Sequence, residues 1–106
     1  MDIHSILEAC EGFLWDEGNS SKSWLKHRVA ERETEEVFFN EPLMLVADMA
    51  HSQNEARFRA MDYTDNDRYL FVVFMVRAKL IRIISARDMN RRERVIYEKF
   101  KASAKI

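Results

Sequence analysis

The sequence predicts an α+β domain with short N-terminal helices, an antiparallel sheet of about four strands and a closing C-terminal helix. Three observations carry this prediction. Apolar residues at helical spacing dominate the first third of the chain, β-rich runs fill residues 43–86, and a helical pattern returns after residue 90. The 106 residues suit a single domain, 1–106, and a hydrophobic content of 47% is enough to form a core.

Two or three short helices are expected before the sheet. Residues 3–10 place their apolar side chains on one helical face, and residues 13–15 can form a short strand. Residues 22–29, "KSWLKHRV", follow cap-type residues and read as a second helix. Thr34 before two glutamates predicts the start of another helix, "TEEVFFN", which Pro42 would end.

The sheet is expected from four runs of β-forming residues. Residues 43–47 form the first, and residues 56–63 alternate, with two arginines pointing one way. Residues 69–77, "YLFVVFMVR", are almost continuously apolar and indicate a central strand. Residues 80–86 follow after a tight turn. Because the links have hairpin length, antiparallel pairing is favoured.

The last helix is expected over "RRERVIYEKFKASAK". Its first turn carries three arginines, although positive charge at a helix N-terminus is mildly unfavourable. Stability therefore does not explain these arginines, whereas a surface kept basic for an anionic partner does. The apolar face of this helix is expected to contain Val95, Ile96, Tyr97 and Phe100.

The net charge of −1 conceals an asymmetry between the two halves of the chain. Residues 1–56 hold four basic and twelve acidic residues, whereas residues 57–106 hold thirteen basic and six acidic ones. A basic half suits a polyanion such as nucleic acid, or an acidic protein. The alternative is that the two halves pair with each other in the fold.

Several classes of protein are disfavoured. The longest apolar run, residues 70–76, is far shorter than the ~20 residues of a membrane span, so no membrane association is expected. A single cysteine, Cys10, fits an inert thiol in the cytoplasm. His51 and Asp48 lack a third ligand at a recognised spacing, so neither a metal nor another cofactor is expected.

Five segments resemble the BrnT family of toxins. They are "FLWDEGNSSKSWLKH" (13–27), "EEVFFNEPL" (35–43), "HSQNEARFRAM" (51–61), "RYLFVVFMVR" and "IRIISARDMNRRERVIYE". They occur in the family's order and span about residues 13–100, which leaves residues 1–12 as an N-terminal extension. The last segment is the most distinctive because it is long and combines "RIISAR" with "RRERxxYE".

The resemblance implies a RelE-like fold and a ribonuclease toxin of a bacterial type II toxin–antitoxin pair. It implies a metal-independent endoribonuclease that cleaves messenger RNA, inhibits translation and acts in the cytoplasm. Its partner would be a small BrnA-like antitoxin, through which the complex binds DNA. The alternative is a catalytically weak or inactive relative that serves as an antitoxin- or nucleic-acid-binding module.

The chain departs from the family at three positions where glycine is usual. Arg28, Asp62 and Asp67 stand there instead. Asn and Asp tolerate the left-handed conformation better than other side chains, so Arg28 is the hardest to accommodate. The helix end that carries the neighbouring Lys26 and His27 is therefore expected to differ in shape from that of the family.

Cleavage of RNA without a metal needs a base for the 2′-hydroxyl proton, cations on the phosphate and an acid for the leaving oxygen. The candidate catalytic residues are Lys26, His27, Glu55, Arg57 and Arg87. The candidate RNA-binding residues are Arg59, Arg77, Arg82, Arg91 and Arg92.

Each of these residues also has a structural interpretation. The arginines could be solvated or paired with Asp62, Asp88 or Glu93, and Arg82 could equally be a phosphate ligand or a partner for a carboxylate. His51 and Glu55 could form a second acid–base pair or belong to a polar loop. The tryptophans, Trp15 and Trp24, are expected mainly to pack rather than to stack on bases.

Overall fold

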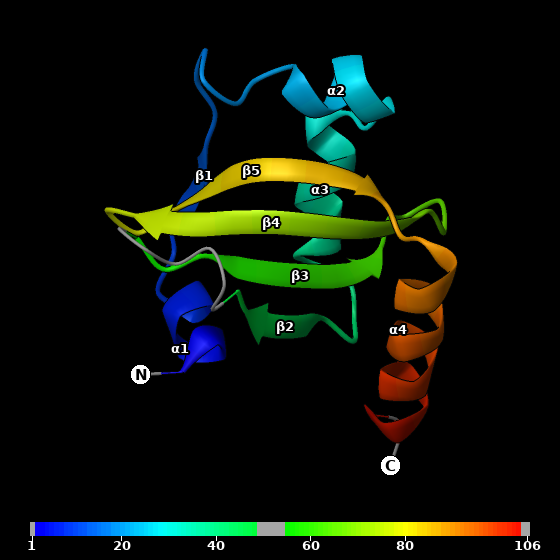
Figure 1. Ribbon diagram of the computed structural model, residues 1–106. Helices are drawn as coiled ribbons and strands as arrows, with labels where there is room; N and C mark the ends of the chain where they lie inside the picture. The colour runs from blue at the N-terminus through cyan, green and yellow to red at the C-terminus, as the bar shows by residue number, and fades with distance from the viewer. Residues whose placement is uncertain (1, 49–54, 105–106) are drawn as a thin grey trace.

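The computed structural model describes residues 2–48 and 55–104, and it contains one five-stranded sheet with four helices (Figure 1). The elements are α1 (Ile3–Glu8), β1 (Gly12–Leu14), α2 (Lys22–His27), α3 (Glu31–Val37), β2 (Met44–Ala47), β3 (Phe58–Tyr63), β4 (Tyr69–Arg77), β5 (Leu80–Asp88) and α4 (Arg91–Ala104). The α+β class predicted from the sequence is confirmed. None of the helices in the described ranges combines the length and the hydropathy that crossing a bilayer requires.

The sheet has the order β1-β5-β4-β3-β2, and its strands β2 to β5 form the expected antiparallel meander. The prediction of an all-antiparallel sheet of four strands is wrong in one respect, because β1 adds a fifth strand parallel to β5. Gly12 pairs with Leu80 and Leu14 with Arg82. A three-residue strand whose partner lies almost 70 residues away leaves no local pattern that could reveal this pairing.

The third helix begins earlier than the sequence pattern suggests. Ala30 occupies the N-cap, and its N–H donates to the Glu33 side chain over 3.0 Å. Thr34, the expected cap, lies one turn inside the helix, where it is buried and donates to the Ala30 carbonyl. Because Glu33 returns to the N-cap from the third helical position, the Thr–Glu–Glu pattern marks the interior of this helix and not its start.

One face of the sheet forms the core against α3, which lies behind the strands in Figure 1. The Phe74 ring lies 5.2 Å from that of Phe38 and 5.5 Å from that of Phe58. The buried aliphatic members of this core are Val29, Val37, Ala60, Leu70, Val72, Ile81, Ile83 and Ala86. Alternate residues of β3, β4 and β5 therefore point to the opposite face, which turns away from α3.

The closing helix projects from the body of the domain (Figure 1), and only Tyr97 of its 14 residues is buried. Val95 and Ile96 are exposed, so the expectation that they join the core is wrong. The Tyr97 hydroxyl lies 2.8 Å from both the Pro42 carbonyl oxygen and Asp62 Oδ1. The Tyr97 hydroxyl therefore joins α4 to β3 and to the segment before β2.

Asp62 is buried beside this tyrosine, and its Oδ2 atom has no hydrogen-bond partner among the described residues. Burial raises the pKa of Asp62 from 3.8 to about 6, against the opposing effect of hydrogen bonds from Tyr63 and Tyr97. The folded protein therefore binds this proton more tightly than the unfolded chain does. The contribution of Asp62 to the free energy of unfolding is fully present below about pH 4 and is lost as the pH rises through about 6.

Replacing Asp62 with asparagine should remove this pH dependence, because the amide stays neutral. Relative to wild type, D62N should become more stable by about 2 kcal/mol as the pH rises from 4.5 to 7.5. Urea unfolding at several pH values measures the difference. The exposed Asp65→Asn variant should follow the wild-type profile, and a difference for D62N that stays constant with pH would contradict the assignment.

Candidate functional site

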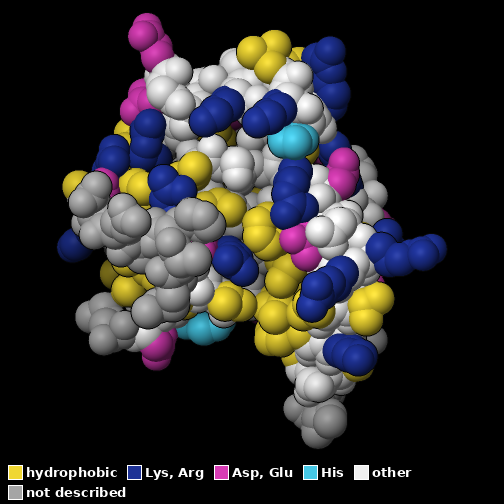
Figure 2. Space-filling view, in the orientation of Figure 1, with side chains coloured by type: hydrophobic (Ala, Val, Ile, Leu, Met, Phe, Trp, Pro, Cys, Tyr) yellow, Lys and Arg dark blue, Asp and Glu magenta, His cyan; other side chains and the backbone are white. Residues whose placement is uncertain are grey.

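The face of the sheet that turns away from α3 gathers basic side chains around apolar ones. Figure 2 shows this face, where lysine and arginine side chains surround a hydrophobic area. Four of its arginines form ion pairs with carboxylates. The pairs are Arg59–Asp48 at 3.1 Å, Arg77–Glu55 at 2.7 Å, Arg82–Asp16 at 2.6 Å and Arg87–Glu93 at 2.8 Å.

In two of the pairs the carboxylate is less exposed to solvent than the guanidinium that it binds. The Arg59 side chain is 39% exposed and its partner Asp48 only 5%. Arg87 is 34% exposed, whereas Glu93 is 16% exposed. A carboxylate that is less exposed than its guanidinium partner fixes the orientation of the guanidinium and leaves the guanidinium accessible to solvent. Arg59 and Arg87 are thus presented to solvent in defined positions.

Arg87 is the most constrained of the four. Its two terminal nitrogens donate to the two carboxylate oxygens of Glu93 over 2.8 and 2.9 Å, and its guanidinium lies 4.3 Å from the Phe71 ring centroid. Glu93 is itself fixed, because it accepts from the Asn90 N–H and donates its own N–H to Asn90 Oδ1. This is a capping box, so the start of α4 positions Arg87.

The charges of this pair reinforce each other. Burial acts to raise the pKa of Glu93, but the hydrogen bonds from Arg87 and Asn90 outweigh it and leave the pKa lowered. The Glu93 hydrogen bond in turn raises the pKa of Arg87. The charge of Arg59 also lowers the pKa of Glu93, which places both arginines near the same carboxylate.

The other two pairs differ from these. The Arg82 guanidinium is only 15% exposed and its partner Asp16 is 50% exposed, which is the arrangement of a structural pair. The structure shows Arg82 paired with a carboxylate, and a contact of Arg82 with phosphate stays a prediction. Arg77 and Glu55 are both exposed, and the hydrogen bond from Arg77 lowers the pKa of Glu55. A carboxylate with a lowered pKa is a weaker base.

The remaining sheet and helix candidates lie around this face. Arg57 precedes β3, is half-buried, and its carbonyl accepts from the Asp48 N–H over 2.8 Å. Arg91 and Arg92 are exposed at the start of α4. His51 lies outside the described residues.

Lys26 and His27 reach the sheet from its edge. They end α2, which lies along the part of β5 that β1 does not cover (Figure 1). Ser23 fixes this contact by accepting from the Ala86 N–H over 2.9 Å. Lys26 is exposed and His27 half-buried.

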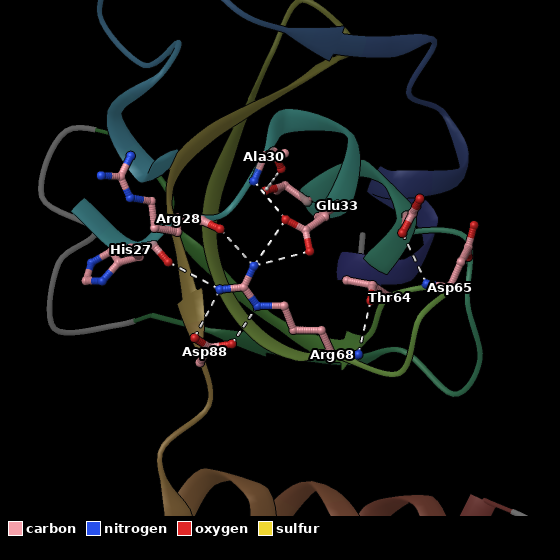
Figure 3. Close-up of polar contacts among 10 residues, drawn as sticks. His27, Arg28, Ala30, Glu33, Thr64, Asp65, Arg68 and Asp88 are labelled. Atoms are coloured by element: carbon pink, nitrogen blue, oxygen red, sulfur yellow. Dashed lines mark hydrogen bonds and ion pairs between the residues drawn. The ribbon is translucent and has the colours of Figure 1, made fainter. Parts of the chain in front are cut away.

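A single arginine, Arg68, ties the end of α2 to the sheet (Figure 3). It donates to the carbonyl oxygens of Arg28 over 2.8 Å and His27 over 3.2 Å. It also donates to both carboxylate oxygens of Asp88, over 2.7 and 3.1 Å, and to Glu33 over 3.1 Å. Sequence reasoning missed this residue, because its partners are 20 to 41 positions away and no spacing rule connects them.

Two of the three glycine departures adopt the conformation that glycine favours, and the network accounts for one of them, Arg28. Arg28 has φ 56° and Asp67 φ 63°, so both adopt the left-handed conformation that glycine favours. At Arg28 the strained residue donates to the Trp24 carbonyl and accepts from Arg68, which hold the conformation in place. Asp62 is different, because it lies in β3 with no positive φ, and its side chain rather than its backbone matters.

The two tryptophans behave differently from each other. Trp15 is half-buried and donates from Nε1 to Glu35 over 2.8 Å, so the packing interpretation is confirmed for it. Trp24 is 46% exposed, and the packing interpretation is wrong for this residue. Periodicity placed it beside Leu25 on a helix, but α2 is too short and too peripheral to bury either side chain.

A metal centre finds no support in the described ranges, where no group of three or more His, Cys, Asp or Glu side chains stands close enough to hold an ion.

The fold and the site together define a small α+β protein. One face of its sheet packs against α3, and the opposite face, called the open face, bears arginines oriented by carboxylates. A family model described as ribonuclease toxin, BrnT, of type II toxin-antitoxin system matches residues 15–93, and the chain belongs to this family. The resemblance read from its motifs is thereby confirmed. Among curated proteins no match is found. Membership indicates a ribonuclease toxin with an RNA target and an antitoxin protein as partner.

Replacing Arg68 with alanine should destabilise the fold, because it leaves Glu33, Asp88 and two carbonyls facing one another. We expect the free energy of unfolding to fall by about 2–3 kcal/mol, the scale of hydrogen bonds to charged groups, and the melting temperature to fall by about 10 °C or more. Arg32→Ala is the control, since its exposed pair with Glu36 should contribute less than about 0.5 kcal/mol. Equal melting temperatures for the two variants would contradict this assignment.

Proposed function

We propose that the chain is a metal-independent endoribonuclease that cuts messenger RNA on the open face of its sheet and so inhibits translation in the cytoplasm. A small BrnA-like antitoxin would neutralise it, and DNA would bind through the antitoxin. The observation that carries this proposal is the pair of guanidiniums, Arg59 and Arg87, each held by a less exposed carboxylate on the face of the sheet that turns away from α3.

The two guanidiniums suit a phosphate in its transition state. An arginine has five N–H donors, and the contacts of Arg87 with Glu93 and with the Asp88 carbonyl use only some of them. The remaining donors can bind phosphate oxygens, and the charge persists at any physiological pH. Donors fixed before the substrate arrives stabilise developing negative charge most effectively. In this proposal Arg57 adds a further phosphate contact.

The proton transfers fall to residues at the edge of β5. One base takes the proton of the 2′-hydroxyl, whose oxygen attacks the phosphorus, and one acid gives a proton to the departing 5′-oxygen. An imidazole is the side chain best suited to either task near neutral pH, which favours His27. Lys26 beside it would stabilise the phosphate or share the proton transfer. Glu55 is the weaker candidate base because of its lowered pKa.

The remaining arginines would extend the RNA path beyond the reacting phosphate. Arg77 and Arg82 lie toward the β4–β5 turn, and Arg91 and Arg92 lie at the start of α4. Contacts of this kind contribute to affinity without sequence preference, and they make binding weaken steeply with salt.

A binding module without catalysis is the second candidate. The observation that favours it is that four arginines of this face already have carboxylate partners, so that much of its charge is balanced within the fold. Such a protein would bind its antitoxin and leave RNA intact.

Arg87→Ala should lower the rate of RNA cleavage by about 100-fold or more, as the loss of one transition-state donor does in other enzymes. Expression of this variant should no longer arrest bacterial growth. Cleavage of a labelled messenger RNA, followed in a buffer that contains EDTA, measures the rate and tests metal independence together.

Arg32→Ala, on the covered side of the fold, is the matched control and should cleave normally. A folded R87A protein that cleaves within about twofold of wild type would contradict the assignment of Arg87. A wild-type protein that binds antitoxin but never cleaves RNA would select the binding module instead.

A further inference from the structure

A hollow of about 430 Å³ lies between α2 and α3, and two tryptophans, Trp15 and Trp24, form part of its lining. We propose that this hollow is a nucleobase slot, in which one base of the RNA substrate stacks on Trp24. The inference rests on the proposed function, since it names a contact of the same substrate. It concerns a site away from the arginines of the open face.

The aromatic residues supply a stacking surface. Trp24 remains 46% exposed, and the Arg28 guanidinium lies 5.4 Å from its ring centroid. Trp15 is a fixed wall because Glu35 accepts its indole N–H. An indole left at the surface is an effective platform for a base, and a nearby guanidinium adds attraction for the adjoining phosphate.

The polar groups of the hollow suit a base rather than a phosphate. Ser21 caps α2 with φ 67°, a costly conformation for this residue, yet its hydroxyl makes no capping hydrogen bond. Glu31 accepts from the Ser20 hydroxyl through Oε2, which leaves Oε1 for a ligand. A carboxylate repels phosphate but accepts from the exocyclic amine of a base. The slot should therefore favour adenine, cytosine or guanine over uracil.

The slot lies within reach of the proposed chemistry. Trp24, Lys26 and His27 share α2, whose six residues span only about 9 Å. Arg68 fixes the end of this helix against β5, so the slot and the proton-transfer residues have a constant spacing. A base held at Trp24 would therefore belong to a nucleotide next to the one that is cut, and would select the cleavage site.

The test is the affinity of the full chain for RNA oligonucleotides whose riboses are 2′-O-methylated, which blocks the attacking hydroxyl and prevents cleavage. Fluorescence anisotropy gives the dissociation constants. Trp24→Ala should weaken binding about tenfold, the loss expected for one base-stacking contact, whereas Trp24→Phe should stay near wild type. Leu25→Ala is the matched control, since Leu25 is exposed on the same helix and does not line the hollow.

A second measurement does not depend on the alanine variant folding. RNA should quench the tryptophan fluorescence of the wild-type protein, and oligo(A) should bind more tightly than oligo(U), with the preference lost in Glu31→Ala. Unchanged affinity in W24A together with weakened binding in Arg87→Ala would overturn the slot and leave the proposed function standing. Failure of the wild-type chain to cleave unmodified RNA would remove the proposed function as well.

Discussion

The C-terminal end of α2 is held to the sheet by one side chain, Arg68. It is the cation shared by two carboxylates, Glu33 and Asp88, and by two carbonyls at the negative end of α2. The hydrogen bonds from Arg68 lower the pKa of Asp88, and those of Asp88 and Glu33 raise the pKa of Arg68. Without this cation the acceptors would repel each other at the point where two helices meet the sheet.

The hydrogen bonds of Arg68 connect the left-handed backbone of Arg28 with the candidate active site. Arg28 can occupy a left-handed conformation because its carbonyl and N–H are both engaged. Lys26 and His27 precede it, so the same contacts determine where these two side chains stand relative to the edge of β5. At Arg28 the departure from glycine is therefore compensated by an arginine 40 positions later in the chain.

The charge asymmetry of the sequence has its main explanation in the fold. Four ion pairs join an acidic residue of the first half to an arginine of the second. They are Asp16–Arg82, Glu33–Arg68, Asp48–Arg59 and Glu55–Arg77. The structure thus shows the pairing of the halves that the sequence left open. The Arg59 guanidinium remains more exposed than the Asp48 carboxylate and is therefore accessible to a partner of opposite charge.

Local patterns and the family motifs predicted much of the fold. The apolar run of β4 and the turn to β5 were sufficient to find the meander, and a strongly alternating segment identified β3. Three features escaped because they depend on contacts distant in sequence. These are the parallel pairing of β1, the hydrogen-bond network of Arg68 and the projection of α4. The projection of α4 leaves Val95 and Ile96 exposed to solvent. The sequence predicted which arginines are candidates for the site, but it did not predict most of the carboxylates that pair with them.

The most direct test of the role of Arg68 is amide hydrogen exchange in the folded Arg68→Lys protein. A lysine keeps the charge but cannot bridge two carboxylates and two carbonyls. The amides to follow donate within and just after α2: Leu25 to Ser21, Arg28 to Trp24 and Val29 to Ser23. We predict that these amides exchange faster than in wild type while those of β4 remain protected. Unchanged exchange in α2, or equal acceleration throughout the sheet, would contradict the claim that this arginine fixes α2 in place.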